Sequence, residues 1–120
     1  MTLRTILLAA VALTLGAAMP AQAETSPAFE EARDFVVAGK VGQALLVIGV
    51  GAMGINDQDD EGLTLLHYAV KSGSLESVTE LLRAGADPKI EAKGVGRAIN
   101  LAATGAIREA LRDAAIQAQH

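Results

Sequence analysis

One stretch of the chain, residues 59–88, has the pattern of two short helices joined by a tight turn. Thr64 is suited to begin the first helix, because its hydroxyl can accept a hydrogen bond from a free backbone N–H. Gly73 can adopt the left-handed conformation that ends it, and Gly85 can end the second helix in the same way. The segment therefore predicts a helix-turn-helix unit.

The apolar residues of this unit fall on one face of each expected helix. On the first helix they are Leu66, Ala69 and Val70, and on the second they are Leu75, Val78, Leu81 and Leu82. Two such faces are stable only when packed together, and Ala69 is small enough to let the helices approach. We therefore expect both helices to be buried on one side.

Weaker copies of the pattern lie on both sides. Upstream, Gly39 and Gly51 have the same separation as Gly73 and Gly85, while Ser26-Pro27 has the form of a helix N-cap followed by proline. Downstream, a degenerate copy recurs at nearly the same period, at Ile99, Asn100, Ala102, Leu111, Ala114 and Ala115. This last copy is loaded with charge at Arg97, Arg108, Glu109, Arg112 and Asp113, as is typical of a terminal repeat facing water.

The central unit resembles the ankyrin repeat. Thr64-Leu65-Leu66-His67-Tyr68-Ala69 is similar to the family's T-P-L-H-x-A, and residues 81–87 match its L-L-x-x-G-A-D. The resemblance implies an all-α, ankyrin-like solenoid of about three helix-turn-helix repeats with degenerate terminal repeats, in units of about 26–57, 58–90 and 91–120. It also implies a structural role for His67, bonded to backbone across the turn. Leu65 replaces the usual proline, so we expect a slightly frayed helix start.

The N-terminal segment has the zones of a secretory signal peptide. Arg4 is its only charge, an apolar and small-residue run of 13 positions follows from Ile6 to Ala18, and Ala21-Gln22-Ala23 provides a small-x-small cleavage site. The run is shorter than the ~20 residues that span a bilayer. We expect residues 1–23 to be removed, releasing one domain of residues 24–120 to the periplasm or the exterior with no membrane attachment. An uncleaved anchor is the alternative.

Composition excludes several classes of function. The chain has no cysteine, so disulfides, thiolate metal sites and thiol nucleophiles are excluded. Without Arg4, nine basic residues face 14 acidic ones, a net charge of −5 that disfavours nucleic acid. No nucleophile and base stand at a useful spacing, and His120 is terminal, so we expect neither an enzyme nor a cofactor.

Two motifs merit comparison with ligand sites. Residues 57–62, Asp-Gln-Asp-Asp-Glu-Gly, match the first half of a calcium-binding EF-hand loop, but position 12 is Tyr68 where a glutamate is required. We interpret these acids as a solvated β-turn finger between repeats and expect no metal. Gly49-Val50-Gly51 and Gly94-Val95-Gly96 lack the third glycine of a phosphate loop and are interpreted as turns.

The resemblance implies protein binding through the finger tips and the exposed side of each first helix. The residues that match those places are Asp60, Glu61, Leu63, Tyr68, Lys71, Ser72, Lys93 and Thr104. Tyr68 is the only tyrosine and the chain has no tryptophan, so we expect it to be the central contact of an acidic groove, on the exposed side of its helix.

The leading hypothesis is a monomeric, periplasmic binding or adaptor module whose partner is a protein. An inhibitor or immunity protein that blocks an exported enzyme or toxin is the alternative, since an acidic face could cover a basic cleft. A small hydrolase is a third class, disfavoured by the missing catalytic pair.

Export yields the first prediction. The mature protein is expected to begin at Glu24 and to be released by osmotic shock, because signal peptidase cleaves after the small residue Ala23. N-terminal sequencing of the released protein checks this. Intact Met1 in a membrane pellet would contradict cleavage and favour an anchored protein.

Overall fold

The computed structural model describes residues 25–117. The expected signal peptide, its cleavage site and His120 lie outside the described residues. Within residues 25–117 no helix is both long and apolar enough to cross a membrane.

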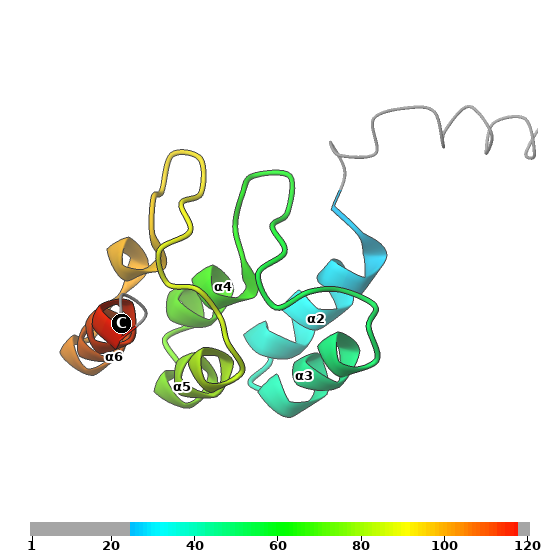
Figure 1. Cartoon of the computed structure of the whole chain (residues 1–120), viewed down its shortest axis with the longest axis horizontal. Helices are drawn as coiled ribbons and strands as arrows, with labels where there is room; N and C mark the ends of the chain where they lie inside the picture. Colours follow the sequence, from blue (N-terminus) through cyan, green and yellow to red (C-terminus); the bar gives the residue numbers. More distant parts are fainter. Residues whose placement is uncertain (1–24, 118–120) are drawn as a thin grey trace, which may run out of the picture.

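The described chain folds into three stacked pairs of helices (Figure 1). The first pair is α2 (Pro27–Val37) and α3 (Val41–Gly49), and the second is α4 (Leu65–Ser72) and α5 (Leu75–Arg83). The third is a short 3₁₀ helix, η2 (Ala98–Leu101), with α6 (Gly105–Gln117). The helices α2, α4 and η2 form one layer and α3, α5 and α6 the other, which confirms the predicted all-α repeat architecture.

The predicted helix ends are confirmed. Thr64 caps α4 by accepting from the backbone N–H of His67, and Gly73 ends it with a φ of 80°. Ser26 caps α2 by accepting from the N–H of Phe29, with Pro27 at the first helical position. Local polar groups therefore define where these helices begin and end.

The core runs continuously through the stack. Its largest fully buried apolar side chains are Phe29, Val36, Leu65, Leu66, Val70, Val78, Leu81, Ile107 and Leu111. Val78 and Leu81 lie on the predicted face of α5, but Leu75 is 43% exposed, so its assignment to that face was wrong. Leu75 is the first residue of α5, directly after the cap Ser74, so it lies at the very start of the helix.

Leu65 also departs from expectation. Helix α4 begins at Leu65 without fraying, and the Leu65 side chain is completely buried. Burying a leucine contributes about 1.5 to 3 kcal/mol. This apolar contact, together with the Thr64 cap, holds the start of the helix in place of the family's proline.

The third unit has lost most of its first helix. The 3₁₀ helix ends at Leu101, Ala102 is extended, and Thr104 instead caps α6 by accepting from the N–H of Ile107 at 3.2 Å. All five charged residues of this unit predicted to face water are exposed, as a terminal repeat requires.

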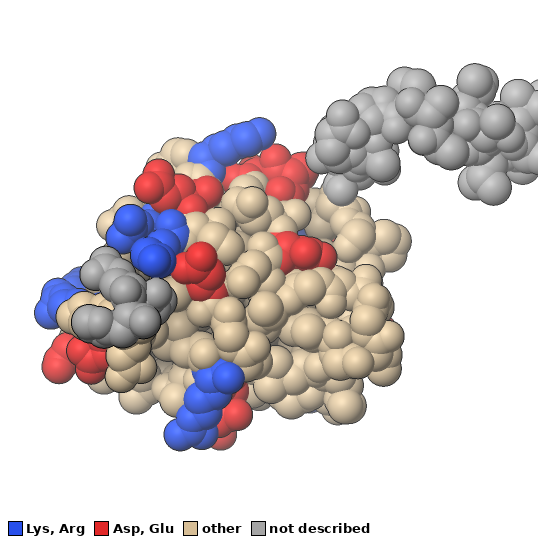
Figure 2. Space-filling view, viewed as in Figure 1, with Lys and Arg blue, Asp and Glu red and all other residues tan. Residues whose placement is uncertain are grey.

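At the opposite end of the stack, α3 lacks such a charged surface within the described residues. No residue of α3 is charged, and Leu46 of α3 and the adjoining Val50 are 67% and 78% exposed. Charged side chains instead gather over the long loops and α6 (Figure 2). The two ends of the stack therefore present surfaces of different chemistry.

Core burial yields the second prediction. Leu81→Ala is expected to lower the free energy of unfolding by about 2 to 5 kcal/mol, because it removes a fully buried side chain between stacked helices. Urea denaturation measures the loss. Leu75→Ala on the same helix is the matched control and is expected to change stability by less than about 1 kcal/mol. Equal losses would contradict the packing described.

Candidate functional site

Two long loops project from the same side of the stack (Figure 1). We call residues 54–63 the first finger and residues 87–96 the second. Lys93 N–H donates to the carbonyl of Glu61 at 3.0 Å, and the Gln58 side chain donates to the carbonyls of Gly62 and Glu91 at 2.7 and 3.4 Å. These bonds tie the fingers together, so their tips form one continuous edge.

Asp59 organises the first finger. One of its carboxylate oxygens accepts from the N–H groups of Glu61 and Leu63, each at 2.9 Å, and the other accepts from the Tyr68 hydroxyl. Gly62 closes the turn with a φ of 85° and donates its N–H to the Asp59 carbonyl at 2.9 Å. The acidic segment is therefore a turn, as predicted, and its central carboxylate is occupied by donors within the chain.

His67 connects the start of α4 to the second finger. Its Nδ1 accepts from the Thr64 N–H at 3.1 Å, so the neutral ring carries its proton on Nε2, which donates to the Gly96 carbonyl at 2.8 Å. The ring is 1% exposed. The structural role implied for His67 is confirmed, and no atom of the ring is left for chemistry.

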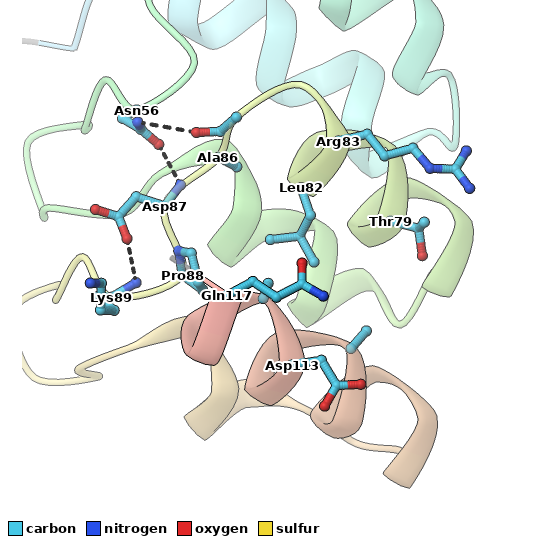
Figure 3. A pocket seen from close by; sticks show the side chains of 13 residues that line it. Asn56, Thr79, Leu82, Arg83, Ala86, Asp87, Pro88, Lys89, Asp113 and Gln117 are labelled. Atoms are coloured by element: carbon cyan, nitrogen blue, oxygen red, sulfur yellow. Dashed lines mark hydrogen bonds between the residues drawn. The ribbon is translucent and has the colours of Figure 1, made fainter. Parts of the chain in front are cut away.

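A hollow of about 730 Å³ lies between α5 and α6 (Figure 3). Its apolar wall comprises Leu82, Pro88, Ala110 and Ala114. Ala114 occupies the position in the third unit that Leu81 occupies in the second, so a small side chain takes the place of a large one and leaves space. The internal repeat contained this signal, but the hollow itself was not predicted.

Asn56 forms one edge of the same region. Its side chain donates to the Gly85 carbonyl at 3.5 Å and accepts from the Asp87 N–H at 2.8 Å, while Asp87 accepts from the Lys89 N–H at 2.9 Å (Figure 3). The rim of this hollow carries charges of both signs, Arg83, Asp87, Lys89 and Asp113. It therefore favours no single class of charged ligand.

Tyr68 lies on the exposed side of α4 but is only half exposed, which corrects the expectation of an open side chain. Its ring meets Phe29 edge to face with centroids 6.2 Å apart, and the Arg33 guanidinium carbon lies 5.8 Å from the ring centroid. Burial and the hydrogen bond to the Asp59 carboxylate raise the pKa of Tyr68 to about 12. The ring thus joins α2, α4 and the first finger.

A second hollow, of about 470 Å³, opens between α2 and α4, and we call it the groove. Arg33 and Val37 on α2 face Tyr68, Lys71 and Ser72 on α4. Three predicted site residues are therefore brought together here. Because the groove is lined by two cations, the expectation of an acidic groove around Tyr68 was wrong.

The other predicted residues lie elsewhere. Asp60, Glu61 and Lys93 are exposed on the fingers, and Leu63 is half-buried at the base of the first finger. Thr104, expected on the exposed side of a first helix, caps α6 because that helix ends early.

Arg33 and Val37 were missed. Val37 occupies the position in the first unit that Lys71 occupies in the second, so the repeat register could have identified it. Arg33, in contrast, is apparent only from its position over Tyr68.

A stack of helix pairs with fingers projecting from one side defines a helical repeat protein that presents a binding surface. Residues 61–93 match the family model of the ankyrin repeat, so this part of the chain is an ankyrin repeat. Ankyrin repeats mediate protein–protein interaction, and the matched repeat indicates an interaction module. No curated protein matches the chain.

The tyrosine provides the third prediction. Because Tyr68 is the only tyrosine and tryptophan is absent, the ultraviolet absorbance of tyrosinate reports this one ring. In rapid-mixing titrations of the folded protein the midpoint is expected near pH 12, against about 10 for a free tyrosine. The raised pKa means that the stability contributed by neutral Tyr68 is complete below about pH 10 and is lost as the pH rises toward 12.

Asp59→Asn is expected to lower that midpoint, because it removes the negative charge beside the hydroxyl. Asp57→Asn is the matched control, since Asp57 bonds the Gly54 N–H and not Tyr68. A wild-type midpoint near 10, or equal shifts in both variants, would contradict the described contact.

Proposed function

We propose that this protein is an exported adaptor that grips a protein partner along the side formed by the finger tips and the groove. The observation that carries the proposal is the groove itself, an open hollow flanked by Tyr68, Lys71 and Ser72 on the finger-bearing layer. Tyrosine and arginine, which line the groove as Tyr68 and Arg33, are residue types enriched at the energetic centres of interfaces. The partner would bind as a ligand of a single copy of the chain.

The N-terminal segment supports export as part of the same proposal. Its apolar run and the Ala21-Gln22-Ala23 pattern suit cleavage after Ala23 and release to the periplasm or beyond. The lack of cysteine removes any dependence on disulfide formation there.

A binding role accords better with the chemistry of the groove than a catalytic one. The Tyr68 hydroxyl donates a hydrogen bond to Asp59, and its raised pKa keeps it neutral at physiological pH, where it would be a poor base. His67 is buried with both ring nitrogens bonded. The groove therefore offers contact surface in place of a nucleophile and base.

The inhibitor alternative depended on an acidic face. Exposed carboxylates such as Asp60 and Glu61 lie on the first finger, while the groove beneath carries Arg33 and Lys71. Coverage of a basic cleft would have to use the finger tips alone. The structure offers no observation that favours this alternative over an adaptor.

Single cysteines test the binding surface, since the natural chain has none to interfere. Ser72→Cys in the groove and Lys93→Cys on the second finger would each carry a short photo-crosslinker, and Glu76→Cys on the outer layer would be the control. In periplasmic extract we expect the same partner to be crosslinked from Ser72 and Lys93 but not from Glu76.

Crosslinking that is equal from all three positions would contradict a specific surface. Crosslinking from Glu76 alone would place the partner on the α5 side and reject the proposed face. Thermal melts of each labelled variant control for folding.

A further inference from the structure

The charge of the groove is opposite to that of the whole chain. Two of its five lining residues, Arg33 and Lys71, are cations, and among the described residues that line it none is acidic. The full chain carries a formal net charge of −4. A partner selected by overall charge would therefore be basic, whereas a segment seated in the groove meets positive side chains first.

The Arg33 guanidinium is held in a position where it can bind a carboxylate from a ligand. Its guanidinium carbon lies 5.8 Å from the Tyr68 ring centroid, which restrains it, and its side chain retains 30% exposure. Its acidic neighbour Asp34 lies 3.4 Å away with a side chain that is 75% exposed. Such exposed pairs contribute little, so an arriving carboxylate can share or replace Asp34 on the planar guanidinium.

Asp59, the acid that contacts Tyr68, already has hydrogen-bond donors within the chain. The Asp59 carboxylate accepts from the Tyr68 hydroxyl and two backbone N–H groups. Lys71 lies in the last turn of α4. The C-terminal end of a helix carries a partial negative charge of about half an elementary charge, and the lysine offsets it. The helix end therefore leaves part of the lysine charge for a ligand.

The groove also has an apolar wall. Val37 is 56% exposed, and the Tyr68 ring lies across from it on α4. An exposed valine beside an aromatic ring gains from contact with an apolar side chain, because both surfaces leave water. A purely charged ligand would leave this wall uncovered.

We propose, building on the binding function above, that the groove recognises a peptide segment of the partner in which an aspartate or glutamate stands beside an aromatic or branched aliphatic residue. The carboxylate lies between Arg33 and Lys71, and the apolar side chain packs on Val37 and Tyr68. The ligand chemistry is thus a side-chain carboxylate joined to an apolar neighbour.

Random-peptide display on the immobilised protein, purified from cells that express the full chain, tests the chemistry directly. We expect enrichment of peptides with an acidic residue next to an apolar one. The overall negative charge of the protein would, by itself, enrich basic peptides instead. Enrichment of basic peptides, or of no peptide, would overturn the proposal.

The best enriched peptide and its matched amide, with glutamine or asparagine in place of the acid, then serve as fluorescent probes. Lys71→Glu is expected to weaken the acidic peptide at least about tenfold, since a close interfacial charge is reversed. Lys40→Glu changes the net charge by the same amount in the exposed α2–α3 turn and is expected to alter Kd less than about twofold. Arg33→Gln is a second groove variant, and thermal melts verify that each is folded.

Binding of the acidic peptide is also expected to weaken with added salt, whereas binding of the amide is not. Equal effects of Lys71→Glu and Lys40→Glu, or equal affinity for the acid and its amide, would overturn the proposal. If Ser72→Cys still crosslinks a partner whose contacting segment is basic, the groove chemistry fails while the binding function stands. If Ser72→Cys crosslinks nothing, both fail.

Discussion

The buried imidazole of His67 is the interaction on which the arrangement of the stack most depends. Its acceptor nitrogen holds the start of α4 at Thr64, and its donor nitrogen holds the carbonyl of Gly96 in the next unit. Gly96 has a φ of 79°, and a Cβ there would lie 2.7 Å from the Asn100 side chain, so the second finger turns at a position that favours glycine. One ring thus ties the start of α4 to the end of the second finger.

Much of the fold could be predicted because its signals are local. Caps such as Thr64 and Gly73 act on the nearest turn of helix, and their consequences follow from residue type and spacing alone. Leu75 failed the same reasoning, since helical periodicity assigns a face but does not tell how far along the helix a neighbour extends. The shortened first helix of the third unit was not predicted either.

The residues of the binding surface could be predicted only where their position within a repeat unit identifies them. Lys71 and Ser72 could be placed by analogy within a unit, and both line the groove. The environment of Tyr68 could not, since Phe29, Arg33 and Asp59 come from different elements and meet only after the units stack. The positive charge of the groove comes from Arg33 on α2 together with Lys71 on α4, and a count of charges over the chain suggests the opposite sign.

Because the two ends of the stack differ in charge, adding a further helix pair by design is easier at one end than at the other. A fourth helix pair grafted ahead of α2 would find the uncharged α3 surface, with Leu46 and Val50 ready to be buried. The same pair grafted after α6 would have to desolvate the charges of Arg108, Glu109 and Arg112, which costs free energy unless each finds a partner. Extension of this array by design therefore has one favourable end.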